Sequence, residues 1–361
     1  LVQHAAATAN PRRLALAALA LVRGVSVREL AGAIPARDAD WLAQVKANAQ
    51  APLPFGIAVD LPDWLIARLR TSMDDASITA LADALNRPAP LDLRVNLLKG
   101  ERDALAQGFA AEGIRALPTP YSPWGLRLPD KPALARHPRF LDGTVEVQDE
   151  GSQLLCVLTG ARRGEMVVDF CAGAGGKTLA IGAAMRSSGR VYAFDVAEKR
   201  LAKLKPRLVR SGLSNVHPQR IDSERDPRVK RLAGKVDRVL VDAPCSGLGT
   251  LRRNPDLKWR QRESDLAELT AKQGAILAAA AALVKPGGRL VYATCSVLPE
   301  ENEAIAEAFL AAQPAFARES APALLRDARI DLPQQEDEYL RLRPDVHDTD
   351  GFFACAMVRV R

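Results

Sequence analysis

Short apolar runs alternate with longer helical patterns over the last two hundred residues of the chain. The runs have the length of β-strands and lie at Met166–Phe170, Arg190–Asp195, Val216–Ile221, Arg238–Val241, Arg289–Thr294 and Phe352–Val360. The intervening segments have helical spacing, most clearly Ser264–Leu283, and Pro286-Gly287-Gly288 is expected to end that helix and turn into the next strand. Repeated β-α units predict a mostly parallel sheet with helices on both faces.

The first part of the chain has a different pattern. Residues 1–85 are rich in Ala and Leu and are expected to be helical. The Ala/Leu run Leu14–Val22 is shorter than the ~20 residues of a membrane span, so we interpret it as a buried helix that ends at Gly24. A second helix is expected to begin at Pro62-Asp63. The chain starts with Leu, which leaves open whether residues precede it.

A small α+β unit is expected between these regions, over residues 86–143. Apolar and polar residues alternate along Leu91–Asn96, as in a half-buried strand. A helix at Asp103–Glu112 and a short strand at Leu126–Leu128 are expected to follow. The sequence therefore predicts three parts: a helical region 1–85, the small unit 86–143 and an α/β domain 144–361.

The overall charge is positive, at +7, with an isoelectric point near 9.3. Basic residues gather at 199–210, 225–238 and 252–262, which favours a polyanionic partner, although a solvated basic surface would look the same. The five cysteines are scattered and form no CxxC pair, so we expect no metal site and a reducing compartment, the cytoplasm.

The turn after Phe170 contains three glycines and is suited to a cofactor. Glycine allows positive φ and close approach of a ligand, and the amides of the next helix would face an anionic group. The P-loop pattern fails because Cys171 stands at its first glycine position, and the GxGxxG pattern fails as well. A tight strand-to-helix turn without a ligand remains an alternative.

Aspartates follow three successive strands beside this turn. Asp195 is placed to bind the ribose hydroxyls of a nucleoside, Asp222 is suited to the adenine amine, and Asp242 ends the next strand. Any one of them alone would more often cap a turn. Together they favour a nucleoside cofactor without pyrophosphate, and S-adenosylmethionine fits better than NAD or ATP.

Two cysteines, Cys245 and Cys295, follow neighbouring strands, and each precedes a serine. Carbon 5 of cytosine accepts a methyl group only after a thiolate adds to carbon 6, and the carbon-5 proton and the thiol must then leave. The two thiols could perform attack and release, with Asp242 opposite ring nitrogen 3. An isolated cysteine is more often an inert buried thiol, but a pair at adjacent strand ends makes this reading weaker.

The chain resembles the Fmu/Sun (RsmB/Nop) family of S-adenosylmethionine-dependent RNA cytosine-5 methyltransferases. The resemblance covers residues 145–361. It rests on Gln148–Gln153, Asp169–Thr178, Asp195, Asp222, Asp242–Gly247 with Gly249-Thr250, Ala293–Ser296, Glu300–Glu303 and Asp350–Phe353. It implies a Rossmann-like class I methyltransferase domain with a seven-stranded, mostly parallel sheet.

The resemblance also implies roles for individual residues. Cys295 is then the nucleophile and Cys245 the release thiol, whereas in DNA cytosine methyltransferases the Pro-Cys cysteine attacks. Lys177 and Asp242 are expected near the target base. The residues expected to bind the cofactor are Cys171, Ala172, Gly173, Ala174, Gly175, Gly176, Lys177, Asp195, Arg200, Asp222 and Asp242. The family turn often reads Ala-Ala-Pro-Gly-Gly-Lys, and Ala174 stands here in place of the proline, which loosens the turn.

A target cytosine must be single-stranded or flipped out to expose carbon 6. Five residues are expected to contact RNA: Arg94, Arg252, Arg253, Lys258 and Trp259. For Trp259, a role as a core anchor is equally open. We expect ribosomal RNA as substrate, on the resemblance and on the helical start, which could be a remnant of a NusB-like domain.

Three other functions remain open at this stage: a transfer RNA methyltransferase, a DNA methyltransferase, and an RNA-binding ribosome-assembly factor with dispensable catalysis. The protein is expected to be a monomer without membrane association.

Overall fold

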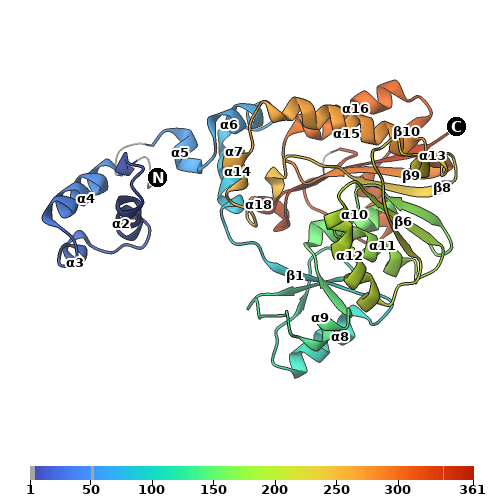
Figure 1. Ribbon diagram of the computed structural model, residues 1–361, viewed down its shortest axis with the longest axis horizontal. Coiled ribbons are helices and arrows are strands. Elements are labelled where there is room, and N and C mark those ends of the chain that lie inside the picture. Colours follow the sequence, from blue (N-terminus) through green and yellow to red (C-terminus); the bar gives the residue numbers. More distant parts are fainter. Residues whose placement is uncertain (1–4, 50–52, 336) are drawn as a thin grey trace. The chain divides into compact units, whose positions relative to one another are not determined.

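The computed structural model describes residues 5–49, 53–335 and 337–361 and divides into two compact units, 1–82 and 83–361 (Figure 1). In the first unit the described residues form helices. They are α2 (Pro11–Leu21), α3 (Val27–Ala31), α4 (Ala36–Asn48), α5 (Phe55–Val59), α6 (Asp63–Leu69) and most of α7 (Asp75–Leu85). Helix α2 starts earlier than expected because Asn10 caps it, accepting hydrogen bonds from the amides of Arg12 and Arg13. That residues 1–85 are a remnant of a NusB-like domain stays a prediction.

The second unit begins with a small antiparallel sheet. Its strands β1 (Leu91–Val95), β2 (Leu117–Pro118), β3 (Gly125–Leu128) and β4 (Val145–Val147) have the order β2-β3-β1-β4. Helices α8 (Arg102–Ala111) and α9 (Pro138–Leu141) belong to the same part of the chain. Leu93 and Val95 pack with Phe109 of α8, so the alternate residues of β1 face the other way. Strand β4 lies beyond residue 143, so the small sheet extends past the end of the α+β unit that the sequence predicted over residues 86–143.

The large sheet has the strand order β10-β12-β9-β8-β5-β6-β7, and β11 pairs with β12. Its strands are β5 (Met166–Asp169), β6 (Arg190–Asp195), β7 (Val216–Arg220), β8 (Val236–Asp242), β9 (Val284–Thr294), β10 (Phe316–Glu319), β11 (Leu340–Leu342) and β12 (Phe352–Arg359). Strands β5 to β9 pair in parallel, and β10, β11 and β12 pair antiparallel. The structure confirms the parallel-rich α/β fold and adds an eighth strand to the expected seven.

Helices cover both faces of this sheet (Figure 1). One face packs against α10 (Glu150–Thr159), α11 (Gly176–Ala184), α12 (Glu198–Ser211) and α17 (Ala321–Asp327). The other packs against α13 (Pro227–Lys230), α15 (Asp265–Ala281) and α16 (Glu303–Ala312). Two short helices, α14 (Leu257–Arg260) and α18 (Pro344–His347), lie in connections.

One expected boundary is wrong. Pro286-Gly287-Gly288 does not form a turn before the strand, because β9 already begins at Val284. Val236 pairs with Val284 and Arg238 with Arg289, so the three residues form an irregular bulge inside the strand. Gly287 has φ +75°, and a Cβ at Gly288 would lie 2.9 Å from the Asp237 carbonyl oxygen, which explains why glycines stand there.

The strand order reverses between β5 and β8, because the chain runs through β5, β6 and β7 to one side and then returns to β8 and β9 on the other. Ligands bind outside the carboxyl ends of the strands at such a switch point. Within the described residues, no helix is both long and apolar enough to span a bilayer.

Candidate active site

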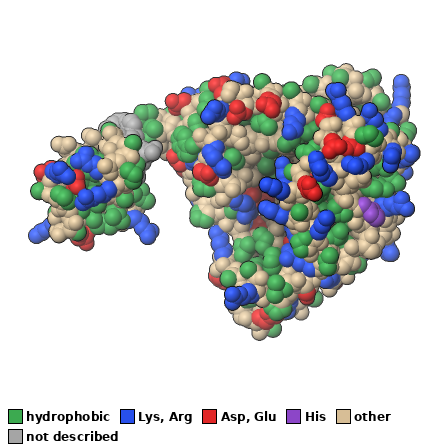
Figure 2. Space-filling view, viewed as in Figure 1, with side chains coloured by type: hydrophobic (Ala, Val, Ile, Leu, Met, Phe, Trp, Pro, Cys, Tyr) green, Lys and Arg blue, Asp and Glu red, His purple; other side chains and the backbone are tan. Residues whose placement is uncertain are grey.

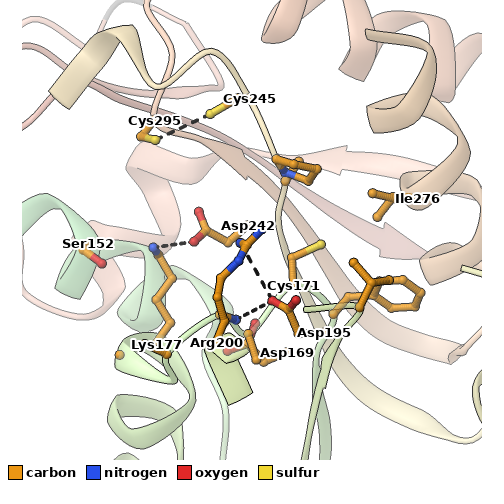
Figure 3. Close-up of a pocket in the computed structure, with 18 of the residues that line it drawn as sticks. Ser152, Asp169, Cys171, Lys177, Asp195, Arg200, Asp242, Cys245, Ile276 and Cys295 are labelled. Carbon is orange, nitrogen blue, oxygen red and sulfur yellow. Dashed lines mark hydrogen bonds and ion pairs between the residues drawn. The ribbon is translucent and has the colours of Figure 1, made fainter. Parts of the chain in front are cut away.

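A cavity of about 650 Å³ opens at the carboxyl ends of β5, β6, β8 and β9. Its lining includes the glycine turn, and Figure 3 shows the aspartates of the strand ends and both Cys245 and Cys295 around it. Four cations also line it: Lys177, Arg200, Arg207 and Lys272. Figure 2 shows Lys and Arg side chains around a hollow on the face in view. The cavity is therefore lined by apolar side chains, carboxylates, thiols and four cations together.

Asp195 holds the glycine turn in place. Its Oδ2 accepts a hydrogen bond of 2.8 Å from the Gly173 amide, and its Oδ1 accepts one of 2.6 Å from the Ala197 amide. Gly175 has φ +81°, and a Cβ there would lie 2.1 Å from Cδ1 of Leu204 on α12. Only glycine fits at this position, because the turn and α12 approach so closely.

Asp169 supplies an unused acceptor at the base of the cavity. Its Oδ2 accepts a hydrogen bond of 2.6 Å from the Thr178 hydroxyl, whereas its Oδ1 is buried and has no hydrogen-bond partner among the described residues. Burial raises the pKa of this carboxyl to about 7. An ammonium group would satisfy it, and the N-terminal amides of the nine-residue helix α11 are available to a carboxylate beside it. The pair of sites fits the amino-acid end of S-adenosylmethionine.

The other end of the cavity fits a nucleoside. Asp195 and Arg200 offer polar contacts there, and Arg200 Nη1 lies 4.0 Å from Asp195 Oδ2. Val196, Ile221 and Ile276 line the cavity with apolar side chains against which a base can pack. An amino-acid subsite and a nucleoside subsite in one cavity match the two halves of this cofactor.

Most residues expected at the cofactor line the cavity: Cys171, Ala172, Gly173, Ala174, Gly176, Lys177, Asp195, Arg200 and Asp242. Two do not. Gly175 turns toward Leu204, and Asp222 points to solvent with 74% of its side chain exposed and pairs with Arg220. Asp222 was assigned from its position after β7, but that strand ends at Arg220, and the neighbours Ile221 and Glu224 line the cavity instead.

Lys177 and Asp242 form an ion pair inside the cavity, with 2.7 Å between Nζ and Oδ2 (Figure 3). Burial alone would lower the pKa of Lys177, but the Asp242 carboxylate outweighs it and raises that pKa above its usual value. The lysine therefore stays charged. Asp242 keeps 28% of its side chain exposed, so this carboxylate is accessible to a ligand.

The two cysteines face each other across the ends of β8 and β9. Cys245 Sγ lies 3.5 Å from Cys295 Sγ (Figure 3). The hydrogen bond with Cys295 and burial raise the pKa of Cys245 well above that of a free thiol. Cys245 therefore stays protonated at neutral pH and can donate its S–H to the sulfur of Cys295.

A buried carboxylate that the sequence analysis did not single out connects the two cysteine turns. Glu301 accepts hydrogen bonds from the Ser246 amide at 2.8 Å and from the hydroxyls of Ser246 and Ser296. Gln273 of α15 donates to the same carboxylate at 3.0 Å. The serine after each cysteine and the acidic run at 300–303 carried this signal, but only the fold brings them together.

Comparison with known proteins agrees with this geometry. The family model described as 16S rRNA methyltransferase RsmB/F matches residues 156–358, and the ferredoxin-like domain of RsmF/B-like methyltransferases matches residues 61–134. The chain belongs to the RsmB/F methyltransferase family. It is accordingly an S-adenosylmethionine-dependent methyltransferase, as the resemblance implied.

Individual relatives span most of the chain. It is 37% identical over 84% of its length to "Probable ribosomal RNA small subunit methyltransferase B" of Synechocystis, covering 68% of that protein. It is 36% identical to ribosomal RNA small subunit methyltransferase B of Salmonella arizonae, over 82% of this chain and 66% of the relative. A solved methyltransferase homologue from Pyrococcus horikoshii is 30% identical with a TM-score of 0.67, over 82% of this chain and 99% of the other.

Two residues expected to contact RNA are buried, and a third is almost fully buried. Arg94 lies in β1 on the face opposite Leu93 and is fully buried, which lowers its pKa to about 10. Lys258 is 2% exposed and donates to Asn86 at 3.0 Å. Arg252 has 3% of its side chain exposed and donates to Asp350 at 2.8 Å. These assignments are wrong, because a basic residue near the site in sequence can still point into the protein.

The other two expected contacts remain accessible. Arg253 is 32% exposed, although it is paired with Asp149 and Asp350. Trp259 is 59% exposed, so the alternative that it anchors the core is wrong. The exposed cations of α12 had been noted only as a basic cluster; they are Lys199, Arg200, Lys203 and Lys205.

Proposed function

We propose that this protein transfers the methyl group of S-adenosylmethionine to carbon 5 of a cytosine in RNA, with ribosomal RNA as the substrate. The observation that carries the proposal is the pair of thiols, Cys245 and Cys295, 3.5 Å apart at one end of the cavity that also contains the cofactor turn. A single nucleophile would be sufficient for attack. A second thiol in contact with it fits a reaction that must also release the product.

Cys295 performs the attack in this proposal. Its thiolate adds to carbon 6 of the ring, which makes carbon 5 nucleophilic enough to take the methyl group. S-adenosylmethionine supplies that group as an electrophile when bound. Asp242 and the cation of Lys177 hold polar atoms of the ring, and their 2.7 Å ion pair keeps the carboxylate in place.

Cys245 assists release. Its raised pKa keeps it a thiol while Cys295 reacts, and its contact with that sulfur stabilises the thiolate as it forms and as it leaves. After methyl transfer, the carbon-5 proton leaves to a base, the bond between carbon 6 and sulfur breaks, and the 5,6 double bond returns. Cys245 is assigned to this second half of the reaction.

Charge and relatives support an RNA substrate. The exposed cations of α12 and Lys272 stand at or near the cavity and can contact phosphates, and Trp259 can stack on a base. Ribosomal RNA follows from the names of the relatives, of which the chain spans about two thirds. We place the activity in the cytoplasm and expect a monomer.

Two substitutions test the chemistry. We expect Cys295→Ala to abolish methyl transfer and adduct formation, and Cys245→Ala to leave protein bound covalently to RNA, visible as a slower band on a denaturing gel. Cys156→Ala, a buried cysteine outside the pair, is the control. If Cys295→Ala traps RNA and Cys245→Ala does not, the two roles are reversed.

The nucleic acid needs a separate experiment. Incubation with labelled cofactor and either RNA or DNA should label RNA alone. Bisulfite sequencing of ribosomal and transfer RNA from cells with and without the gene should then show a lost methylcytosine in ribosomal RNA. Loss in transfer RNA only would contradict the proposed target while leaving the chemistry intact.

A further inference from the structure

Arg207 of α12 touches the cofactor turn and the small sheet at the same time. Its Nη1 donates a hydrogen bond of 2.6 Å to the carbonyl oxygen of Ala174. Its Nη2 and Nε donate to Oε2 of Glu146 at 2.9 and 3.1 Å. Glu146 belongs to β4, and only 4% of its side chain is exposed. One guanidinium therefore joins the turn to the small sheet.

The contact falls at the residue where the turn departs from the family pattern. Residue 174 is Ala, whereas the family that the sequence resembles often has proline in this turn, and a proline would restrict φ at this position. A residue without the ring has more backbone conformations to lose when a turn becomes ordered around a ligand. The hydrogen bond from the Arg207 guanidinium to the Ala174 carbonyl oxygen restricts the backbone of the same residue.

The small sheet in turn fixes the end of α12. Asn96 donates to the carbonyl oxygens of Ser211 and Gly143 at 2.9 and 3.0 Å. A Cβ at Gly143 would lie 2.6 Å from the carbonyl oxygen of Arg210, so the two segments are in close contact. These contacts tie the segment just before Glu146 to the end of α12, so the Glu146 carboxylate is placed where it can orient Arg207.

We propose that Arg207, oriented by Glu146, is a positioning residue for the cofactor: it preorganises the 171–177 turn and thereby raises the affinity for S-adenosylmethionine. The residue takes no part in the chemistry at the cysteines. The inference does not depend on the nucleic acid or on the base that is methylated.

Arg210 provides a matched control on the same helix. It pairs with the other oxygen of Glu146, Oε1, at 2.6 and 3.0 Å, and it lies over Phe140. It does not line the cavity. Arg207→Ala and Arg210→Ala therefore each remove one arginine from the same carboxylate, but only the first releases the turn.

The decisive measurement is calorimetric binding of S-adenosylhomocysteine to each purified variant. We expect Arg207→Ala to weaken binding about tenfold, Arg207→Lys to weaken it less, and Arg210→Ala to leave it within about twofold. In the protein without cofactor, amide hydrogen exchange over 171–177 should be faster in Arg207→Ala than in Arg210→Ala. At saturating cofactor, kcat should change little while KM for the cofactor rises.

A rescue variant tests the physical reason. Ala174 has a negative φ, and its amide donates no hydrogen bond within the described part of the chain, so a proline there removes no donor that the turn uses. We expect Arg207→Ala with Ala174→Pro to regain a substantial part of the lost affinity. Equal weakening by both arginine variants, unchanged binding in Arg207→Ala, or no recovery in a folded double variant would each overturn the proposal.

Discussion

The hydroxyl oxygens of Ser246 and Ser296 lie 3.1 Å apart, and both hydroxyls donate to the carboxylate of Glu301. Each serine follows one of the two cysteines. Because the carboxylate is buried and accepts from both turns, it fixes one thiol relative to the other. The distance between the two sulfur atoms is therefore fixed by Ser246, Ser296 and Glu301, which do not line the cavity.

Glu301→Gln should slow methyl transfer about tenfold or more, since an amide cannot accept from both serines and the backbone as a carboxylate does. We expect the loss in kcat and in the rate of adduct formation, with little change in cofactor binding. Glu307→Gln, whose side chain is 53% exposed on α16, is the control. Equal effects of the two variants would show that the buried carboxylate has no particular role.

The pH dependence of the unfolding free energy should reveal the ionisation of the Asp169 carboxyl. Its pKa is raised to about 7 by burial, against 3.8 for the ordinary value. The folded state then holds a proton that the unfolded state releases, so this residue stabilises the protein at low pH and loses that effect as pH rises toward 7. We expect the stability of the cofactor-free protein relative to Asp169→Asn to fall by up to about 2–3 kcal/mol between pH 5 and pH 8. A constant difference across this range, measured by denaturant unfolding, would contradict the assignment.

Gly249 should be intolerant of any side chain. Its amide donates to the Cys295 carbonyl at 2.8 Å, and a Cβ would lie 2.2 Å from the carbonyl oxygen of Gly351. Both neighbours are backbone, so they cannot move aside. Gly249→Ala should cost about 3 kcal/mol in unfolding free energy and displace the nucleophile. Gly274→Ala, on α15 with open space around it, should be neutral or stabilising by up to about 1 kcal/mol.

Arg252 should affect folding and not RNA affinity. It is surrounded by carboxylates and nearly buried, with its Nε 2.8 Å from Asp350 Oδ1. Arg252→Ala leaves those acids with fewer partners and should lower stability by about 3 kcal/mol. Arg260→Ala, at a site 65% exposed, should change it by less than about 0.5 kcal/mol. If Arg252→Ala folds as well as the wild type but reduces the salt dependence of RNA binding, the arginine contacts phosphate after all.

The sequence predicted the central strands of the large sheet well because the buried runs of β5, β8 and β9 are apolar. The site residues are also close to strand ends: Asp195 ends β6, Cys295 directly follows β9, and Cys245 comes shortly after β8. It failed at Asp222, since one or two residues past a strand end decide whether a side chain faces the cavity or solvent. It failed at Arg94 and Arg252 because burial of a cation depends on acids and strands distant in sequence. Glu301 and Arg207 could not be assigned for the same reason: their partners are 55 and 61 residues away.

Sulfur atoms as close as those of Cys245 and Cys295 leave no gap into which a flat aromatic ring could slide. The pyrimidine must therefore present one face to both atoms at once, because a thiolate adds to carbon 6 from above the plane of the ring. In the proposed reaction, Cys295 and Cys245 then both lie on the face of the ring from which carbon 6 is attacked, and the Cys245 thiol stays beside the sulfur that forms and later loses the bond. A substrate that entered between the two residues would first have to push apart the turns that Glu301 holds together.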